Sequence, residues 1–285
     1  MTTHLVTGAS GQLGQRVVDH LATLVPAADI IALVRSDDAR AAFAAKGIAT
    51  RTGDYEDPAS LRAAFDGIDR VLLISSSEVG KRAAQHANVL DAAKAAGVGF
   101  VAYTSILNAD TGGMALAEEH LATEAALRDS GIPHAVLRNG WYSENIAGTA
   151  VQSIGMGQHF GAAGEGRFAT ASRQDYAEAA AAVLAGGDHA GKTYELGGDG
   201  NFSLAEYAAL LSELSGKAVA YVNLDEASYA QALVGAGLPE GFAGILADSD
   251  AKAEKGALST ESRDLSDLIG RPTTPMRDTL KAVLG

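Results

Sequence analysis

The most informative segment of this chain is Thr7-Gly8-Ala9-Ser10-Gly11-Gln12-Leu13-Gly14. It follows a short apolar run at 4–7 and opens an amphipathic pattern at 12–25, so it predicts a strand, a tight turn and a helix. Its glycines are spaced G-x-x-G-x-x-G. The first permits the turn, the second lets the backbone approach a pyrophosphate, and the third lets the helix pack on the strand. Backbone N–H groups and the helix dipole would then face an anion, so the stretch from Gly8 to Gly14 predicts a dinucleotide site.

The rest of the first half repeats the same alternation. Short apolar runs bounded by turn residues predict buried parallel strands at 4–7, 30–34, 71–74, 100–104 and 135–137, with weaker ones at 49–51 and 193–196. Helical patterns lie between them at 12–25, 37–46, 58–66, 79–96 and 114–130. Strand and helix in alternation predict right-handed crossovers and an α/β fold, a Rossmann-type doubly wound parallel sheet.

Several boundaries carry local signals. Asp57-Pro58 predicts a capped helix start, Gly97 a helix stop, and Ser203 with Glu206 a capping box. After residue 140 the alternation breaks. The five glycines within 155–166 predict a loop over a cleft, and 225–285 reads as helices joined by short loops.

Composition excludes several classes of protein. Lys plus Arg number 22 against 35 Asp plus Glu among 285 residues, a net charge of −13, so nucleic acid is not an expected partner. There is no cysteine, which removes disulfides and thiol chemistry and favours a cytoplasmic location. No apolar run approaches the ~20 residues of a membrane span. The start runs directly into the first strand, so we expect no signal peptide.

The end of the second strand distinguishes the two nicotinamide cofactors. An acidic residue there would bind the ribose 2′-hydroxyl of NAD, whereas an arginine accommodates the 2′-phosphate of NADP. The chain reads Arg35-Ser36 at this point and has no acid until Asp37. Arg35, with Ser36 as a second donor, therefore predicts NADP(H) as the cofactor.

Other segments carry a family likeness. The glycine turn, Gly53-Asp54-Tyr55, Leu72-Leu-Ile-Ser-Ser-Ser-Glu-Val-Gly80 and Arg138-Asn-Gly-Trp-Tyr-Ser-Glu-Asn145 resemble the NmrA-like group of atypical short-chain dehydrogenases, and within it the bacterial type-2 quinone oxidoreductases. The likeness extends to the tail at 246–250 and 268–274. It implies reduction of a small-molecule quinone by NADPH. It also implies an NADP-binding Rossmann domain at 1–150, with a further strand near 192–197, and a smaller, mostly helical substrate-binding domain at 151–285.

The resemblance also implies where the cofactor lies. Asp54 and Tyr55 would sit near the adenine, and Ser75, Ser76 and Ser77 would run under the pyrophosphate and ribose. Thr104 would lie beside the nicotinamide, with Asn139, Gly140, Trp141 and Tyr142 on its far side. All of these residues follow consecutive predicted strands, whose carboxyl ends form the ligand-binding edge of an open α/β sheet.

The catalytic pair of ordinary short-chain dehydrogenases is missing. They use a serine and a Tyr-x-x-x-Lys pair, but no tyrosine here has a lysine four residues later. Ser105 remains as a catalytic candidate, and His120 stands where the pair should be, with Glu124 one helical turn on. Glu124 could raise the pKa of His120 and favour an acidic imidazolium. The other interpretation is a His–Glu pair on the helix surface.

Alternatives to quinone reduction stay open. Some NmrA-like proteins bind NADP and act as redox-sensing regulators, and the related triphenylmethane dye reductases share the frame. The histidines form no ligand cluster, so we expect no metal. The sequence also leaves a homodimer open.

Overall fold

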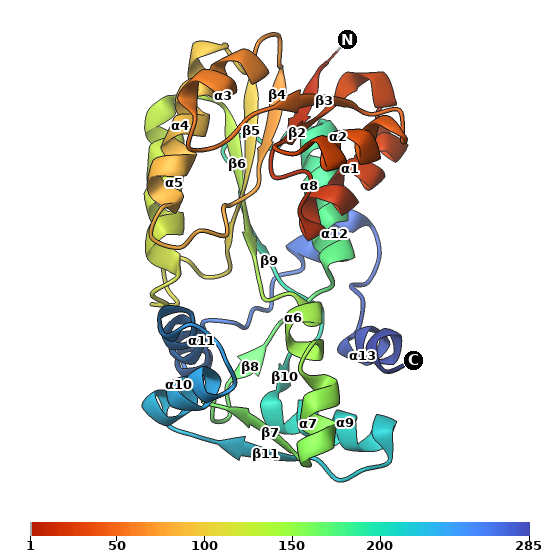
Figure 1. Cartoon of the computed structure of the whole chain (residues 1–285), viewed down its shortest axis with the longest axis vertical. Coiled ribbons are helices and arrows are strands. Elements are labelled where there is room, and N and C mark those ends of the chain that lie inside the picture. Colours follow the sequence, from red (N-terminus) through yellow and green to blue (C-terminus); the bar gives the residue numbers. More distant parts are fainter. Residues whose placement is uncertain (1) are drawn as a thin grey trace.

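A seven-stranded sheet forms the centre of the molecule (Figure 1). The structure is a computed structural model and describes residues 2–285. Its strands run in the order β3-β2-β1-β4-β5-β6-β9, and each neighbouring pair is parallel. The predicted Rossmann-type sheet is therefore confirmed. The strands are β1 His4–Val6, β2 Ile30–Val34, β3 Ala49–Thr52, β4 Arg70–Leu73, β5 Phe100–Ile106, β6 His134–Asn139 and β9 Thr193–Leu196.

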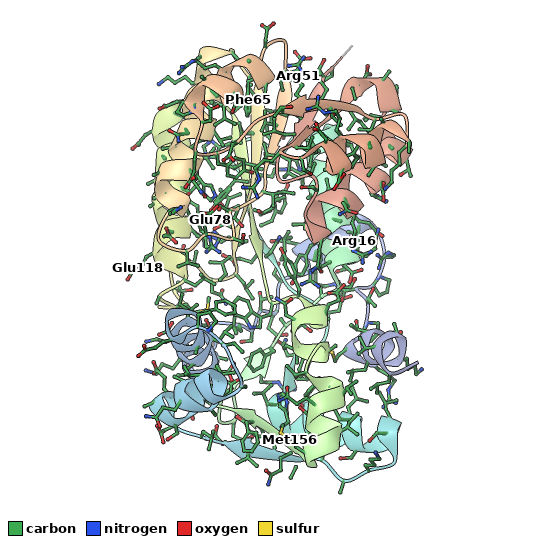
Figure 2. All side chains as sticks on the ribbon, in the orientation of Figure 1. Arg16, Arg51, Phe65, Glu78, Glu118 and Met156 are labelled. Carbon is green, nitrogen blue, oxygen red and sulfur yellow. The ribbon has the colours of Figure 1, made fainter. Side chains whose placement is uncertain are left out.

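Helices cover both faces of this sheet because its central strands are apolar on both sides. Successive strand residues point to opposite faces, so Leu5 packs under one layer of helices and Val6 under the other. One layer consists of α3 Pro58–Ala64, α4 Arg82–Ala95 and α5 Ala117–Ser130. The other consists of α1 Gln12–Leu24, α2 Asp37–Ala44, α8 Arg173–Ala185 and α12 Asp264–Ile269. Phe65, labelled in Figure 2, is fully buried in the first layer.

The helix boundaries largely follow the local signals. The Asp57 carboxylate accepts hydrogen bonds from the backbone N–H groups of Ala59 and Ser60, with Pro58 at the first helical position. α4 begins at Arg82 rather than at residue 79, because the chain turns at Gly80, whose φ is +88°. The predicted capped start at Asp57 is confirmed.

The other end of the molecule holds small sheets and further helices. β7 Gln158–Gly161 pairs in parallel with β11 Ala220–Asn223, and β8 Arg167–Phe168 pairs with β10 Phe202–Ser203. The helices here are α6 Ser143–Ala147, α7 Ala150–Met156, α9 Leu204–Ser215, α10 Glu226–Gly235, α11 Glu240–Ala253 and α13 Met276–Leu284. Ser203 and Glu206 form the predicted capping box of α9.

The expectation of one glycine-rich loop over 155–166 is wrong. The segment starts inside α7, turns at Gly157 in the left-handed region, and then forms β7. Only 162–166 is irregular before β8. The physical reason is pairing with β11, some sixty residues later, which no local pattern could reveal.

The chain crosses between the two ends of the molecule more than once. After β8 it returns as α8, which packs on α1 beneath the sheet, and then as the edge strand β9. It returns again as α12, which packs on α8 and β9. The sheet unit therefore draws α8, β9 and α12 from beyond residue 150. Within residues 2–285, no helix is both long and apolar enough to cross a lipid bilayer.

Candidate functional site

The carboxyl ends of six neighbouring strands form one continuous edge. β1 lies between β2 and β4, and the crossover helices on its two sides cover opposite faces, so this is the switch point of the sheet. Hydrogen bonds brace the edge laterally: Thr7 N–H donates to the Leu72 carbonyl at 3.0 Å, and Ser75 N–H donates to Thr104 Oγ1 at 2.9 Å. The predicted cofactor residues after β1, β2, β3, β4, β5 and β6 are thus brought to one edge.

The glycine turn leaves the start of α1 open. Gly8 has a φ of +58°, in the left-handed region that favours glycine. Gly11 precedes the first helical residue, Gln12, and no side chain caps the N–H groups of this first turn. A Cβ at Gly14 would lie 2.3 Å from the Gly8 carbonyl oxygen, so only glycine allows this helix to pack against the turn. The exposed first turn of a thirteen-residue helix is a site suited to an anion.

Arg35 and Asp54 lie side by side at the ends of β2 and β3. Their closest charged atoms are 3.8 Å apart, and the side chains are 71% and 42% exposed. Ser36 Oγ accepts a hydrogen bond from the Ala39 N–H and so caps α2. A largely exposed guanidinium with one distant partner is free to bind an anion arriving at this edge.

Tyr55 points inward rather than along the edge. Its hydroxyl donates to the Ile74 carbonyl at 2.9 Å and also contacts Thr7 Oγ1 at 2.5 Å. Thr7 Oγ1 in turn accepts from the Ile74 N–H. Burial raises the pKa of Tyr55. Its phenol therefore fastens the end of β1 to the end of β4 directly below the glycine turn.

The serines after β4 belong to a pinned loop. Ser76 N–H donates to His86 Nε2 at 2.9 Å, Ser76 O accepts from the Arg82 guanidinium, and Ser76 Oγ accepts from the Glu78 N–H. Ser75 and Ser76 are half-buried, and Ser77 is exposed. Buried groups on α4 thus fix the backbone of this loop.

The segment after β6 supplies an unsatisfied polar atom. Asn139 is 5% exposed, and its Oδ1 is sealed from solvent and makes no hydrogen bond of ordinary geometry among residues 2–285. At Gly140 a Cβ would come within 3.0 Å of both the Ala169 carbonyl and the Tyr176 hydroxyl. Tyr142 packs edge-on against Tyr176, and Trp141 packs against the apolar cluster around Phe168. A buried amide oxygen without a partner is costly, so this position suits a ligand that donates an N–H.

Ser105 and Glu124 form a structural contact. The Ser105 hydroxyl donates to Glu124 Oε1 at 2.6 Å, and Arg138 binds the same carboxylate through two nitrogens, at 3.0 and 2.8 Å. Arg138 also reaches Asp110 and Glu195, at 2.8 Å each. The hydrogen bond to Glu124 is the main cause that raises the pKa of Arg138.

The expected electrostatic coupling of His120 to Glu124 is wrong. The two side chains are buried, at 4% and 2% exposure, which also rules out a pair on the helix surface. Glu124 faces Arg138, whereas His120 Nδ1 lies 2.8 Å from the Tyr103 hydroxyl and its Nε2 lies 3.4 Å from Arg82 Nη1. Burial, followed by the charge of Arg82, lowers the pKa of His120 to about 3. The imidazole is therefore neutral at physiological pH, not the acid that the sequence suggested.

Sequence reasoning missed Arg82 and Arg138. Both are buried arginines, at 9% and 7% exposure. Arg138 could have been suspected, because it directly follows the apolar run at 135–137 and β6 extends through it. Arg82 carries no such signal, since basic residues near a helix start are usually solvated.

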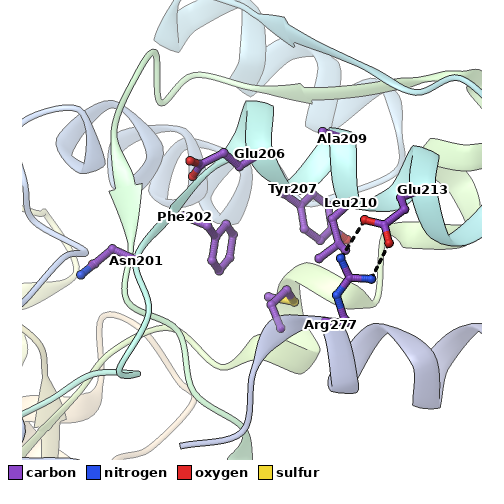
Figure 3. Close-up of a pocket in the computed structure, with 9 residues that line it drawn as sticks. Asn201, Phe202, Glu206, Tyr207, Ala209, Leu210, Glu213 and Arg277 are labelled. Atoms are coloured by element: carbon purple, nitrogen blue, oxygen red, sulfur yellow. Dashed lines mark hydrogen bonds and ion pairs between the residues drawn. The ribbon is translucent and has the colours of Figure 1, made fainter.

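A separate cavity lies away from this edge. It has a volume of about 480 Å³ and lies between α9 and α13 (Figure 3). Phe202, Tyr207 and Met276 line it, and a two-point ion pair between Arg277 and Glu213 borders it at 2.7 Å. In the described part of the chain, no three His, Asp or Glu side chains gather as metal ligands.

The whole chain is similar to proteins of known family and structure. A model of the NmrA-like family matches residues 2–267. Quinone oxidoreductase 2 of Escherichia coli is 52% identical over 275 residues, 96% of each chain. The crystal structure of the NADPH-dependent quinone oxidoreductase of that organism in complex with NADPH superposes with a TM-score of 0.97 at 51% identity, over 99% of this chain and 100% of that one. A triphenylmethane reductase of Citrobacter sp. complexed with NADP(H) gives 0.94 at 40% identity, over 99% and 100%.

Proposed function

Because this chain belongs to the NmrA-like family, and because it is 52% identical to a quinone oxidoreductase over 96% of its length, we propose that it reduces quinones with NADPH. The identity over nearly the whole chain is the observation that carries this conclusion. The strand-end edge supports it, since the residues there fit a dinucleotide from one end to the other.

The turn from Gly8 to Gly14 holds the pyrophosphate in this proposal. Gly8 gives the turn, and Gly11 leaves room at the helix start, where a Cβ would have only the Gly8 carbonyl near it, at 3.2 Å. The backbone N–H groups of Gln12 and Leu13 point from the first turn of α1 toward an anion. Leu13 and Ala9 anchor the turn in the core, while Ser10 is exposed.

The two ends of the edge hold the two halves of the cofactor. Arg35, with Ser36, binds the 2′-phosphate, and Asp54 lies beside the adenosine. Tyr55 acts by positioning the glycine turn from below. Ser75, Ser76, Ser77 and Thr104 carry the middle of the cofactor. At the far end, Asn139 Oδ1 accepts from the nicotinamide carboxamide, while Gly140, Trp141 and Tyr142 form the wall there.

The bound nicotinamide supplies hydride to the quinone. The chain orients the two partners, and orientation alone contributes much of the rate when the acceptor is as reactive as a quinone. No Tyr-x-x-x-Lys pair is required in this proposal. Residues 1–150 with β9 hold the cofactor in this proposal. The remainder of 151–285 covers the acceptor with the apolar residues around Trp141 and Phe168.

A triphenylmethane dye is the second candidate for the acceptor. The Citrobacter reductase, at 40% identity and a TM-score of 0.94, favours it. A regulator that only senses NADP(H) is the third alternative, and it differs from both enzymes by having no turnover.

The test is oxidation of NADPH, followed by its absorbance, with a small soluble quinone and with a triphenylmethane dye in parallel. Faster turnover of the quinone supports the proposal. Turnover of the dye alone would favour the second candidate, and tight NADPH binding without turnover of either would favour the sensor. The cytoplasmic location and the homodimer stay predictions.

A further inference from the structure

Arg82 is a buried cation that contacts no carboxylate among residues 2–285. Its side chain is 9% exposed, and its polar contacts there are the Ser76 carbonyl and His120 Nε2. It is also the first residue of α4, where the helix dipole disfavours a positive charge. Burial lowers the pKa of Arg82, and the more distant charge of Glu119 opposes that shift. An isolated buried charge is costly, so a ligand with negative charge bound beside Arg82 would reduce this cost.

The contacts of Arg82 hold it against the strand-end edge. Its Nε donates to the Ser76 carbonyl, in the loop after β4, and its Nη1 lies 3.4 Å from His120 Nε2 on α5. Its Nη2 makes no hydrogen bond among the described residues and is not sealed from solvent. The protein therefore holds Nε and Nη1 of the guanidinium, and Nη2 is available to a ligand.

The groups around Arg82 keep the positive charge on the arginine alone. His86 and His120 are both neutral at physiological pH, since burial lowers the pKa of His86 to about 4 and that of His120 to about 3. Burial raises the pKa of Tyr103, which contacts His120. Glu119 is engaged elsewhere, with its Oε2 accepting from the Gly80 N–H at 3.0 Å.

The position of Arg82 is toward the end of the edge assigned above to the nicotinamide. Arg82 holds the loop after β4 through the Ser76 carbonyl and contacts His120 on α5. β5 lies between β4 and β6, and Tyr142 follows β6. An acceptor stacked there would meet the guanidinium.

We propose that Arg82 is a catalytic residue that binds the oxygen of the quinone on which negative charge develops, with His120 as the neutral residue that positions it. This inference rests on the proposed function. Hydride carries two electrons and one proton to the quinone, so the first product is a hydroquinone monoanion. One proton from water then completes the hydroquinone. A fixed positive charge aimed at the developing oxyanion lowers the barrier of the first step.

The experiment uses 4-nitrophenol, a one-ring phenol whose anion has its own absorption band. It is titrated with pH on the protein loaded with NADPH, whose reduced nicotinamide ring carries no positive charge. We expect bound nitrophenol to ionise at a pH lower by about one unit than the free compound, a roughly tenfold preference for the anion. Arg82→Gln should abolish this shift, and Arg82→Lys should retain part of it. Displacement by the quinone shows that the probe occupies the acceptor position.

Lys81→Gln is the matched control. Lys81 precedes Arg82, carries the same charge and is 58% exposed, but it pairs with Glu56 at 2.9 Å and with Glu78 at 3.1 Å (Glu78 is labelled in Figure 2). The Lys81→Gln protein should keep the wild-type shift in the ionisation of bound nitrophenol. Arg82→Gln should lower kcat with quinone by roughly 10- to 100-fold. Because Arg82 also donates to the Ser76 carbonyl, kcat is compared at saturating NADPH.

Several outcomes would overturn the inference. They are an Arg82→Gln protein with the wild-type shift, an equal loss of the shift in Lys81→Gln, or bound nitrophenol that ionises no more readily than the free compound in the wild type. The last of these needs no variant, so it decides the matter even if Arg82→Gln does not fold. If the wild type shows the shift but reduces no quinone, the proposed function fails while the anion site at Arg82 stands.

Discussion

Arg35 carries the prediction about cofactor choice. Among residues 2–285, Asp54 is the one carboxylate within 4.0 Å of Arg35, at 3.8 Å, so the guanidinium gives up little on binding a 2′-phosphate. Loss of such a charge-assisted contact costs about 1.5–3 kcal/mol, or roughly 10- to 100-fold in affinity. Arg35→Ala should therefore weaken NADPH by that factor and leave NADH nearly unchanged, as measured by fluorescence titration.

Arg40→Ala is the control for Arg35. Arg40 lies on α2 close by and is half-exposed, but it is engaged with Thr52 Oγ1 at 2.7 Å and with Asp37 at 3.5 Å. It should leave both affinities unchanged. Equal weakening of NADPH and NADH by Arg35→Ala would remove Arg35 from the 2′-phosphate site.

Glu124 carries a prediction about stability instead of catalysis. Its carboxylate is 2% exposed and binds Arg138 at two points, so Glu124→Gln removes the main counter-charge of a buried arginine. Removing one partner of such a pair costs about 3 kcal/mol. Urea denaturation should show that loss, while the pH dependence of quinone turnover stays as in the wild type. A shift of the pH profile to lower pH would instead indicate that Glu124 is electrostatically coupled to His120.

His120 and Glu124 show that two side chains four residues apart on a helix need not interact with each other. His120 and Glu124 are one turn apart on α5, as the sequence indicates, but β5 and β6 lie beneath that helix and supply Tyr103 and Arg138. The carboxylate binds the stronger donor across the interface. The histidine is left among groups that disfavour its charged form.

At the scale of one element, we predict different effects for two glycine substitutions in the turn before α1. Gly14→Ala would place a Cβ 2.3 Å from the Gly8 carbonyl oxygen and 2.7 Å from Ala9 Cα, so the helix must move off the turn. Gly11→Ala meets only the Gly8 carbonyl, at 3.2 Å, and faces the proposed pyrophosphate. We expect Gly14→Ala to lower the thermal midpoint clearly. Gly11→Ala should keep the midpoint within a few degrees and weaken NADPH at least about tenfold.

Two measurements separate these variants, the thermal midpoint without cofactor and the dissociation constant of NADPH. The interpretation of the turn would be contradicted if Gly11→Ala bound NADPH as the wild type does. It would also be contradicted if Gly14→Ala kept the wild-type midpoint.

The molecule as a whole should be sensitive to acid. Burial lowers the pKa of His86 and His159 to about 4 and that of His120 to about 3. Below pH 6.5 these histidines bind protons in the unfolded chain but stay neutral in the folded protein. The free energy of unfolding therefore falls as the pH falls. Each histidine contributes about 1.4 kcal/mol per pH unit until its folded pKa is reached.

Asp250 works in the opposite direction. It is 9% exposed on α11, and burial raises its pKa to about 6, so the folded state binds its proton first as the pH falls. Its contribution offsets that of one histidine between about pH 6 and 4. His4 and His189, whose pKa values burial also lowers, add to the effect of the histidines. We expect the free energy of unfolding of the cofactor-free protein to fall from about pH 6 to pH 5, measured by urea denaturation. His86→Gln should reduce this slope by about 1.4 kcal/mol per pH unit, and a flat profile would contradict the burial of these side chains.

Features that are encoded within a few residues could be predicted from the sequence. Continuous apolar runs predicted five strands of the main sheet, and weaker patterns predicted β3 and β9. Asp57-Pro58 and Ser203 with Glu206 predicted helix starts, and the turn from Gly8 to Gly14 predicted the fold class. These features rest on backbone geometry and hydrogen bonds between near neighbours, so a short window contains their causes. Because parallel strands end at one edge, the row of candidate site residues also followed from their positions after the strands.

Features that depend on partners distant in the sequence could be seen only in the folded chain. β7 exists because β11 pairs with it, and α8 returns to the sheet because α1 offers an apolar face. The charge state of His120 depends on its burial and on Arg82 of α4, and the role of Glu124 depends on Arg138 of β6. Burial and pairing of charges are properties of the assembled interior, where desolvation can reverse the effect that spacing along one helix suggests.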